Sequence, residues 1–258
     1  MALPDHLPNV SDLTLSLIIP AYNEASRICG TLDACNQYFN AEGLTAEIIV
    51  VDDGSVDGTA EIVAREHPEA RVIWYAQNRG KGHAVKAGMA EARGAYRLIY
   101  DADGSTPIGE LAKVWPLTDA GADIVIGSRA LPESDIAIRQ PWYRQNMGRI
   151  YNLLLKGLRL TRFPDTQCGF KVVNAASAEA IMPLITRDGF GMDCEMLAIA
   201  ERKGFRVAQV PVRWLNSKDS RVRVIRDSLE MIREVVVVRW NLTTGKYDRL
   251  ADSASDQG

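Results

Sequence analysis

Short apolar runs alternate along the first half of the chain with longer segments in which apolar residues recur every three or four positions. Each run has the length of a buried strand, and the runs cover residues 15–20, 47–51, 71–75, 97–100 and 123–126. The intervening segments have the spacing of helices that bury one face. This alternation predicts an α/β fold of Rossmann-like type, with a mostly parallel central sheet flanked by helices on both faces.

Capping and breaking residues set the expected helix boundaries. Asn23 or Ser26 can cap the first helix. The helices expected between the strands cover about 26–39, 57–67 and 83–93. In a parallel sheet ligands bind beyond the carboxyl ends of the strands, so we expect the polar residues that follow each strand to share one rim.

After Arg129 the pattern changes to longer segments of helical spacing. Residues 136–160 predict one or two amphipathic basic helices, and residues 165–171 predict a polar turn. The remaining expected elements are helices over 175–185, 193–203 and 222–242 and a strand over 206–214. With no repeat and no linker, we expect one domain over 14–247, C-terminal amphipathic helices, and flexible termini at 1–13 and 251–258.

Composition and charge narrow the class of protein. Of the 258 residues 47% are hydrophobic, enough for the core of one α/β domain, and the net charge of −3 gives no general attraction to nucleic acid. The four cysteines lack metal-binding spacing, so we expect reduced thiols in a cytoplasmic protein. No signal peptide and no run of about 18 apolar residues occur, so any membrane contact is expected to be peripheral, at the cytoplasmic face.

The motif Asp101-Ala-Asp103 follows an expected strand directly and precedes Gly104. Two carboxylates on alternate positions of an irregular segment can converge on one hard cation, which completes its shell with phosphate oxygens and water. The alternative is an ordinary turn at Asp103-Gly104, with Asp101 as a cap. We therefore predict Mg²⁺ or Mn²⁺ at Asp101 and Asp103 and keep the turn as the alternative.

Two common phosphate-binding patterns are absent from the sequence, and a third is present in part. Dinucleotide binding needs Gly-x-Gly-x-x-Gly after the first strand, but residues 21–26 contain no glycine, and no P-loop occurs. Gly80-Lys81-Gly82 opens a helix and could offer backbone N–H groups and one cation to phosphates. Its alternative is an ordinary turn and helix start.

Six motifs resemble a known family in their order and approximate spacing. They are Pro20-Ala-Tyr-Asn-Glu24, Val51-Asp-Asp-Gly-Ser55, Asn78-Arg-Gly-Lys-Gly82, Asp101-Ala-Asp103, Gly127-Ser-Arg129 and Asp165-Thr-Gln-Cys-Gly-Phe-Lys171. The chain resembles the family 2 glycosyltransferases of GT-A fold, and among them the dolichyl-phosphate β-glucosyltransferases, with polyprenyl-phosphate mannosyltransferases as near relatives. The resemblance covers roughly residues 14–247.

The resemblance implies a role for each matching residue. The nucleotide-sugar donor would contact Pro20, Tyr22, Glu24, Asp53, Lys81 and Asp101, with Glu24 suited to a ribose hydroxyl and Asp53 to a base N–H. The metal would be held by Asp101 and Asp103, with Ser105 adding an oxygen or a water-mediated contact. Each residue also has a structural alternative: Tyr22 as a packing aromatic and Glu24 as a charge at a helix start.

The resemblance also implies a catalytic set, made up of Asp103, Arg129, Arg144 and Asp193. The acceptor phosphate would meet Arg129, Arg144, Lys171 and Lys218. Three alternatives stay open: Arg129 as a surface cation, Asp193 as a helix cap, and the segment around Lys218 as an ordinary connection. Asn216 stands where the family often has a glycine, which weakens the assignment of Lys218.

The implied reaction is inverting transfer of a sugar, with glucose from UDP-glucose favoured, to a dolichyl or polyprenyl phosphate. A lipid monophosphate has a second pKa of about 6, so near pH 7 it is already an anionic nucleophile and needs no strong base. The alternatives are GDP-mannose as donor, a soluble acceptor, a nucleotidyltransferase, and a non-catalytic protein that binds a nucleotide sugar.

A lipid acceptor would bring the protein to a membrane surface. Residues 142–162 mix leucine and aromatic side chains with cations, as in an interfacial helix, and core packing is the alternative. For the apolar helix over 222–242, burial and membrane contact are both open. Many relatives carry transmembrane helices, and this sequence shows no apolar run long enough for one. We therefore expect peripheral or oligomer-assisted binding and keep a homo-oligomer as a possibility.

Overall fold

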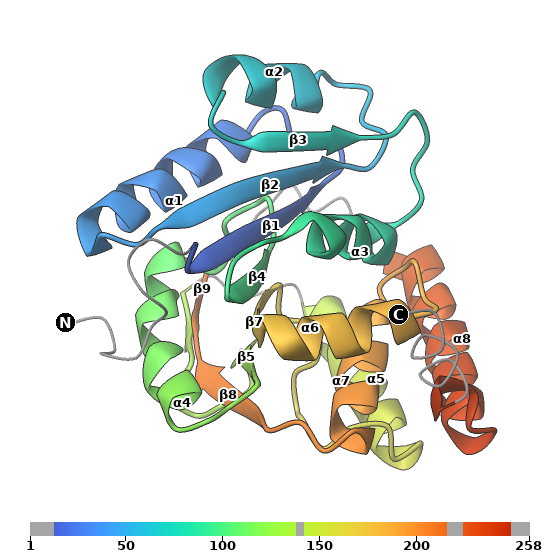
Figure 1. Ribbon diagram of the computed structural model, residues 1–258. Coiled ribbons are helices and arrows are strands. Elements are labelled where there is room, and N and C mark those ends of the chain that lie inside the picture. The colour runs from blue at the N-terminus through green and yellow to red at the C-terminus, as the bar shows by residue number, and fades with distance from the viewer. Residues whose placement is uncertain (1–12, 138–141, 216–223, 249–258) are drawn as a thin grey trace.

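A computed structural model describes residues 13–137, 142–215 and 224–248 of the chain (Figure 1). Its main sheet is formed by β1 Leu15–Ala21, β2 Ala46–Asp52, β3 Arg71–Trp74, β4 Tyr96–Tyr100, β5 Ile124–Ser128, β7 Phe170–Asn174 and β8 Val207–Pro211. The spatial order is β3-β2-β1-β4-β7-β5-β8. β7 is antiparallel to both β4 and β5, and the other pairs in this sheet are parallel. The predicted mostly parallel α/β sheet is confirmed.

Helices cover both faces of the sheet (Figure 1). Their bounds are α1 Ile28–Glu42, α2 Thr59–Glu66, α3 Lys81–Glu91, α4 Trp115–Asp119, α5 Trp142–Gly157, α6 Ala175–Ile181, α7 Met192–Arg202 and α8 Val224–Thr243. Two 3₁₀ helices, η1 Ile108–Lys113 and η2 Met182–Leu184, and a small pairing of β6 Asp135–Ile136 with β9 Arg213–Trp214 complete the elements. No helix in these described ranges has the length and apolarity needed to cross a bilayer.

The core follows from the alternation of side chains along each strand. In β1, Leu17 and Ile19 bury into a cluster with α1, α2, η1 and α4, whereas Ile18 buries into a cluster with α3, α6 and α7. Both faces of the strand are covered, which explains why its sequence is an unbroken apolar run. A third cluster joins α5, α7 and α8 around Leu155, Cys194 and Val235.

Two expectations about local structure need correction. Residues 165–171 were predicted to be a polar turn, but Phe170 and Lys171 begin β7. The charge of Lys171 interrupts an otherwise apolar stretch, so the local pattern of hydrophobic residues does not predict a strand there. The strand predicted over 206–214 is divided into β8 and β9, and the division falls after Pro211, which has no amide hydrogen to continue a ladder.

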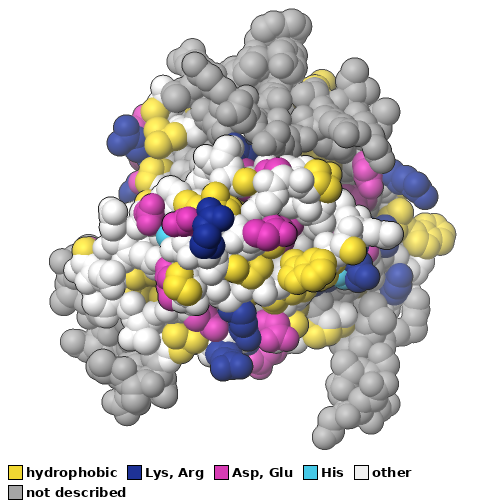
Figure 2. Space-filling view, turned by 90° about the horizontal axis from the view of Figure 1, so that it is seen from above, with side chains coloured by type: hydrophobic (Ala, Val, Ile, Leu, Met, Phe, Trp, Pro, Cys, Tyr) yellow, Lys and Arg dark blue, Asp and Glu magenta, His cyan; other side chains and the backbone are white. Residues whose placement is uncertain are grey.

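The direction of β7 decides which residues reach the rim. Because β7 runs antiparallel to β4 and β5, its first residue lies beside the carboxyl ends of those strands, with Phe170 opposite Tyr100. The segment that precedes β7, residues 165–169, is thereby brought to the same edge as the polar residues that follow β1, β2, β4 and β5. Figure 2, seen from above, shows acidic and basic side chains interspersed on the face that it displays.

All four cysteines are free thiols, as expected, and three of them are buried. Burial raises the pKa of Cys35 to about 12, so this thiol stays protonated and unreactive at neutral pH. The cysteines therefore serve as small apolar side chains of the core.

Candidate active site

A cavity of about 870 Å³ opens at the carboxyl edge of the sheet. Seven residues that the sequence analysis singled out line it: Pro20, Tyr22, Glu24, Asp53, Lys81, Asp101 and Asp103. The lining also includes residues that the sequence analysis missed: Arg27, residues 186–190, and Glu230, Met231 and Glu234 of α8. One wall of the cavity is therefore built by the second half of the chain.

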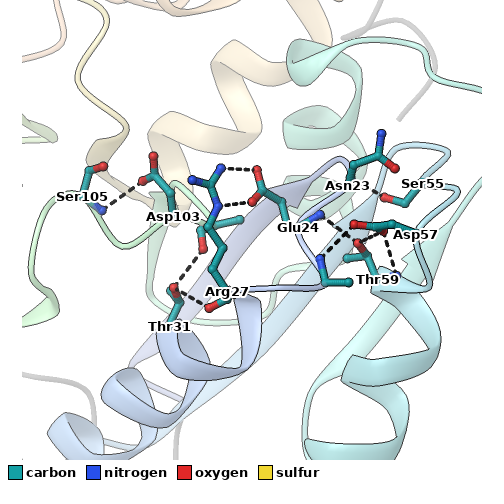
Figure 3. Close-up of polar contacts among 11 residues, drawn as sticks. Asn23, Glu24, Arg27, Thr31, Ser55, Asp57, Thr59, Asp103 and Ser105 are labelled. Carbon is teal, nitrogen blue, oxygen red and sulfur yellow. Dashed lines mark hydrogen bonds and ion pairs between the residues drawn. The ribbon is translucent and has the colours of Figure 1, made fainter. Parts of the chain in front are cut away.

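The loop after β1 is held by hydrogen bonds to the loop after β2 (Figure 3). The amide of Asn23 donates to Ser55 Oγ at 2.8 Å, and Asn23 Oδ1 accepts from the amide of Val56 at 2.9 Å. Asn23 adopts a φ of 56°, a conformation that asparagine tolerates better than most residues. These contacts direct Tyr22 to the cavity with 40% of its surface exposed, which argues against a purely packing role for that ring.

Glu24 lies at the cavity but already has a cationic partner. Both of its carboxylate oxygens accept hydrogen bonds from the guanidinium of Arg27, one of them from Nη2 at 2.7 Å (Figure 3). Its backbone amide donates to Thr59 Oγ1 at 2.9 Å. Arg27 holds the Glu24 carboxylate in one orientation and brings a positive charge to the cavity wall. The predicted contact between Glu24 and a ribose hydroxyl stays a prediction.

Asp53 fixes the entry of α3. Its two carboxylate oxygens accept the backbone N–H groups of Arg79 and Gly80, each at 2.8 Å. Burial raises the pKa of Asp53, and the two N–H donors oppose that rise. A carboxylate oxygen can accept a second hydrogen bond, so these contacts leave the predicted contact with a base open.

The glycines beside Lys81 are required by a close backbone approach. Gly80 has a φ of 104°, and a Cβ there would lie 2.4 Å from the carbonyl oxygen of Asp188. A Cβ on Gly82 would lie 2.8 Å from the carbonyl oxygen of Gly189. The amide of His83, which could have faced a ligand at the helix start, donates to Asp188 O at 3.1 Å. The glycine pair therefore seats residues 187–189 against α3.

Lys81 lines the cavity and pairs with the first aspartate of the acidic motif. Its Nζ lies 2.6 Å from Asp101 Oδ1. Burial opposes the charge of both groups, but the pairing raises the pKa of Lys81 and, helped by Lys171 and Arg129, lowers that of Asp101. Both groups are charged at neutral pH, so the site holds an ammonium beside a carboxylate.

Asp101, Asp103 and Ser105 offer oxygen atoms that suit a hard cation. Asp103 Oδ1 accepts the amide of Ser105 at 2.9 Å (Figure 3), and the buried Ser105 Oγ has no hydrogen-bond partner within the described part of the chain. Gly169 packs so closely on the first carboxylate that a Cβ would lie 1.8 Å from Asp101 Oδ2.

No cluster of three or more His, Cys, Asp or Glu side chains suited to a metal occurs among the described residues. Two carboxylates and an orphan hydroxyl nevertheless fit Mg²⁺ or Mn²⁺, which take few protein ligands and complete their shells with phosphate oxygens and water. The donor set thus suits a metal bound together with a diphosphate rather than a metal enclosed by protein.

Arg129 lies outside this cavity lining and is held by Asp165. The guanidinium donates from Nε and Nη2 to the two carboxylate oxygens at 2.8 and 2.9 Å, and the backbone amide of Arg129 adds a third bond at 2.9 Å. Although burial opposes ionisation, this arginine lowers the pKa of Asp165 to about 2. The Arg129 guanidinium also lies over the Trp214 ring, 5.4 Å from its centroid. Arg129 is not a free surface cation, so that alternative is wrong.

Lys171 lies in the core and not at the cavity, so the structure does not support the prediction that it binds the acceptor phosphate. Its side chain is fully buried, with Nζ 2.7 Å from Asp193 Oδ1 and a further hydrogen bond to the carbonyl oxygen of Cys168. The pairing register of β7 turns this side chain into the core, where Asp193 compensates its charge.

Asp193 is 1% exposed, and its side chain does not cap α7, which begins beside it. The helix-cap alternative is therefore wrong, and the predicted catalytic role rests on a carboxylate already engaged in an ion pair. The neighbouring Glu195 holds the cavity wall instead: it accepts the amides of Thr186 and Arg187 at 2.9 and 2.8 Å.

Two predicted acceptor residues fall where side chains are not described. Arg144 lies on α5 but its side chain is outside the described part of the structure, and Lys218 lies outside the described residues altogether. Their predicted roles stay predictions.

Comparison with known proteins adds independent observations. The family model for glycosyl transferase family 2 matches residues 16–181. A dolichyl-phosphate beta-glucosyltransferase from Dictyostelium discoideum is 32% identical, and the match covers 92% of this chain and 77% of that protein. The dolichyl-phosphate beta-glucosyltransferase ALG5C of Trichomonas vaginalis is 36% identical, and the match covers 92% of this chain and 75% of that protein.

Solved structures share the fold at lower identity. Glucosyl-3-phosphoglycerate synthase from Mycobacterium tuberculosis, in complex with Mn²⁺, UDP and glucosyl-3-phosphoglycerate, matches with a TM-score of 0.68 and 22% identity over 92% of this chain and 87% of that one. Mannosyl-3-phosphoglycerate synthase from Rubrobacter xylanophilus matches with a TM-score of 0.67 and 24% identity over 91% and 75%. At this identity the likeness concerns the fold alone.

Proposed function

The chain belongs to glycosyltransferase family 2 and has the GT-A fold, and from this premise we propose that it moves glucose from UDP-glucose to a dolichyl or polyprenyl phosphate. The observation that carries the proposal is the cavity, where the loops after β1 and β2 meet the carboxylates after β4. The names of the relatives support the lipid acceptor and the sugar.

In the proposed reaction an oxygen of the lipid phosphate attacks the anomeric carbon of the sugar. The bond from that carbon to the diphosphate oxygen breaks, UDP leaves, and in-line attack inverts the configuration to give a β-linked lipid phosphosugar. The acceptor needs no strong base, because its second pKa of about 6 leaves it mostly dianionic near pH 7. The main barrier for the protein to lower is the repulsion between two anions.

Cationic groups of the chain act against that repulsion. Lys81 and Arg27 bring positive charge to the donor cavity, and Arg129, held by Asp165, would offer its remaining donors to the acceptor phosphate. Asp101 and Asp103, with Ser105 nearby, would hold Mg²⁺ or Mn²⁺, as the Mn²⁺ and UDP named for one solved relative support. Bound there, the metal would neutralise charge on the leaving diphosphate.

We further propose peripheral contact with a membrane through α5 and α8. Exposed apolar side chains on these helices are Ile150, Leu153, Ile232, Val236 and Trp240. Exposed cations lie on the same helices or directly after α5, at Lys156, Arg159 and Arg233. This mixture suits adsorption to an anionic lipid surface, where a lipid-embedded acceptor would present its phosphate.

The deciding experiment measures nucleoside diphosphate release with Mg²⁺ or Mn²⁺. UDP-glucose and GDP-mannose are compared, each with and without a short-chain polyprenyl phosphate in detergent and with 3-phosphoglycerate as a soluble acceptor. We expect release that requires both UDP-glucose and the lipid and that stops with chelator. Release from GDP-mannose instead would change the donor, release with the soluble acceptor would change the acceptor, and pyrophosphate as product would indicate a nucleotidyltransferase. Binding without release would leave a non-catalytic protein.

A further inference from the structure

One wall of the donor cavity is a short, glycine-containing segment, residues 186–191, between η2 and α7. Residues 186–190 line the cavity, and the carbonyl groups of Asp188 and Gly189 approach the start of α3 closely, beside Lys81. Glycines have little conformational restriction of their own, so a segment of this kind keeps one shape only if its neighbours hold it.

Two buried glutamates grip the two ends of this wall. At its start, Glu195 of α7 accepts the amides of Thr186 and Arg187 and the Thr186 hydroxyl. At its other end, Glu234 of α8 accepts the amide of Gly191 at 2.7 Å and that of Gly189 at 3.3 Å. Glu195 lies only eight or nine residues after the groups that it binds, whereas Glu234 ties the wall to a helix more than forty residues later.

The fit around Glu234 is tight and its charge is partly desolvated. The side chain of Glu234 also lines the cavity, yet the residue is only 8% exposed. A Cβ on Gly191 would lie 2.6 Å from Glu234 Cβ, so only glycine lets the backbone come this close. Burial raises the pKa of Glu234, and the two amide donors oppose that rise. The Glu234 carboxylate is nearly buried and accepts the amides of Gly189 and Gly191, so it holds the wall through charge-assisted hydrogen bonds.

We propose that Glu234 is a positioning residue for the nucleotide-sugar donor: it sets the 186–191 wall against Lys81 and makes donor affinity depend on the seating of α8. This inference rests on the proposed function in one respect, since it takes the cavity to be the donor site. Glu234 acts through the wall.

The test compares Glu234→Gln with the wild type. Glutamine has the same size, but only one of its two terminal atoms accepts a hydrogen bond, so one of the two amides loses its partner. We expect UDP binding measured by calorimetry with Mg²⁺ to weaken roughly tenfold, in line with the loss of one charge-assisted bond. The donor KM should rise by a similar factor, with kcat and the acceptor KM little changed.

Hydrogen exchange supplies a readout that does not depend on activity. The amides of Gly189 and Gly191 should exchange faster in Glu234→Gln, while amides of the sheet stay protected. Glu66→Gln on α2 is the matched control, because it makes the same chemical change on an exposed side chain far along the chain from the wall. It should leave both readouts unchanged.

The outcomes separate the two proposals. Wild-type protein that binds UDP, with Glu234→Gln binding equally well and exchanging equally slowly at residues 189 and 191, would overturn the inference alone. A variant that loses thermal stability but binds UDP normally in its folded fraction would do the same. Wild-type protein that binds neither UDP nor GDP would overturn the proposed function, and with it the role of Glu234 toward a donor.

Discussion

The two aspartates after β4 have different surroundings, although one residue separates them. Asp101 has an ammonium 2.6 Å away and a glycine packed on its second oxygen, whereas within the described ranges Asp103 accepts the amide of Ser105 in its own turn. The charge of Asp101 is therefore already partly compensated within the protein. Asp103 is the carboxylate with more of its charge left for a metal and a diphosphate.

Asp103→Ala should lower metal-dependent turnover by roughly 100-fold or more, because the variant removes a full charge from the metal site. Its thermal midpoint should stay close to that of the wild type, since Asp103 is only partly buried. Steady-state assays over a range of Mn²⁺ concentrations and a thermal melt measure both. Asp33→Asn, an exposed carboxylate on α1, is the control. Full turnover in Asp103→Ala would overturn the metal assignment.

Asp165 predicts a pH dependence of stability. Its folded pKa of about 2 lies below the ordinary value of 3.8, so its contribution is complete above about pH 4 and is lost as the pH falls toward 2. The shift corresponds to roughly 2 kcal/mol. Asp165→Asn should therefore lower the free energy of unfolding by roughly 2 to 4 kcal/mol at pH 7, since Arg129 loses its charged partner.

Urea denaturation at pH 7, 5, 4 and 3 measures this effect, and the difference between wild type and Asp165→Asn should shrink below pH 4. The control is Asp248→Asn, which alters the exposed pair with Arg202 and should change stability little at any of these pH values. Equal losses in the two variants would contradict the prediction.

At the scale of elements, the start of α3 and the wall at 186–191 depend on each other. Gly82 lies inside α3, where alanine would normally be the better helix former, yet a Cβ there would meet the Gly189 carbonyl and Met192 Cβ, both at 2.8 Å. Packing, not helix preference, requires this glycine.

Gly82→Ala should cost about 1 to 3 kcal/mol of stability, because the helix and the wall must separate to make room for the methyl group. Gly30→Ala in α1 is a matched control: it is also a helix glycine, but a Cβ there meets nothing within 4 Å. That variant should be neutral or more stable by about 0.5 to 1 kcal/mol. Chemical denaturation of both variants measures these changes in the free energy of unfolding. If Gly82→Ala is more stable than the wild type, the wall does not pack tightly on α3.

At the scale of the whole molecule, α5 and α8 carry apolar side chains that lie outside the two clusters covering the main sheet. The helices pack on each other and on α7 around a third buried cluster, whereas Ile150, Leu153, Ile232, Val236 and Trp240 are exposed. A helix that buries one face usually carries polar residues on the opposite face, so exposed apolar side chains on α8 suggest a surface that contacts something other than water.

Trp240→Ser should weaken binding to vesicles that contain anionic lipid by several-fold, because a tryptophan at an interface contributes buried apolar area. Flotation of the protein with vesicles of neutral and anionic composition measures the change. The control is Trp74→Ser, a tryptophan with the same 68% exposure at the end of β3. Equal vesicle binding by wild type and Trp240→Ser would remove α8 from the membrane proposal, and equal weakening by both variants would indicate a nonspecific effect.

The local pattern of the sequence was sufficient for the alternating strands and helices, the mostly parallel sheet and the residues that follow β1, β2 and β4. Strand and helix periodicity are properties of neighbouring residues, and the carboxyl ends of parallel strands meet at one edge whatever the details of packing. For the same reason the sequence alone predicts that Tyr22, Asp53, Lys81, Asp101 and Asp103 lie at one edge of the sheet, and all five line the cavity.

Only the tertiary structure decided which charges are already paired and what builds the far wall of the cavity. Arg129 is held by an aspartate 36 residues away, and Gly191 by a glutamate 43 residues away. Lys171 is buried because β7 enters the sheet antiparallel beside a matching aspartate. The physical reason is that the environment of a charged side chain is set by groups that folding brings close, and sequence spacing carries no information about those groups.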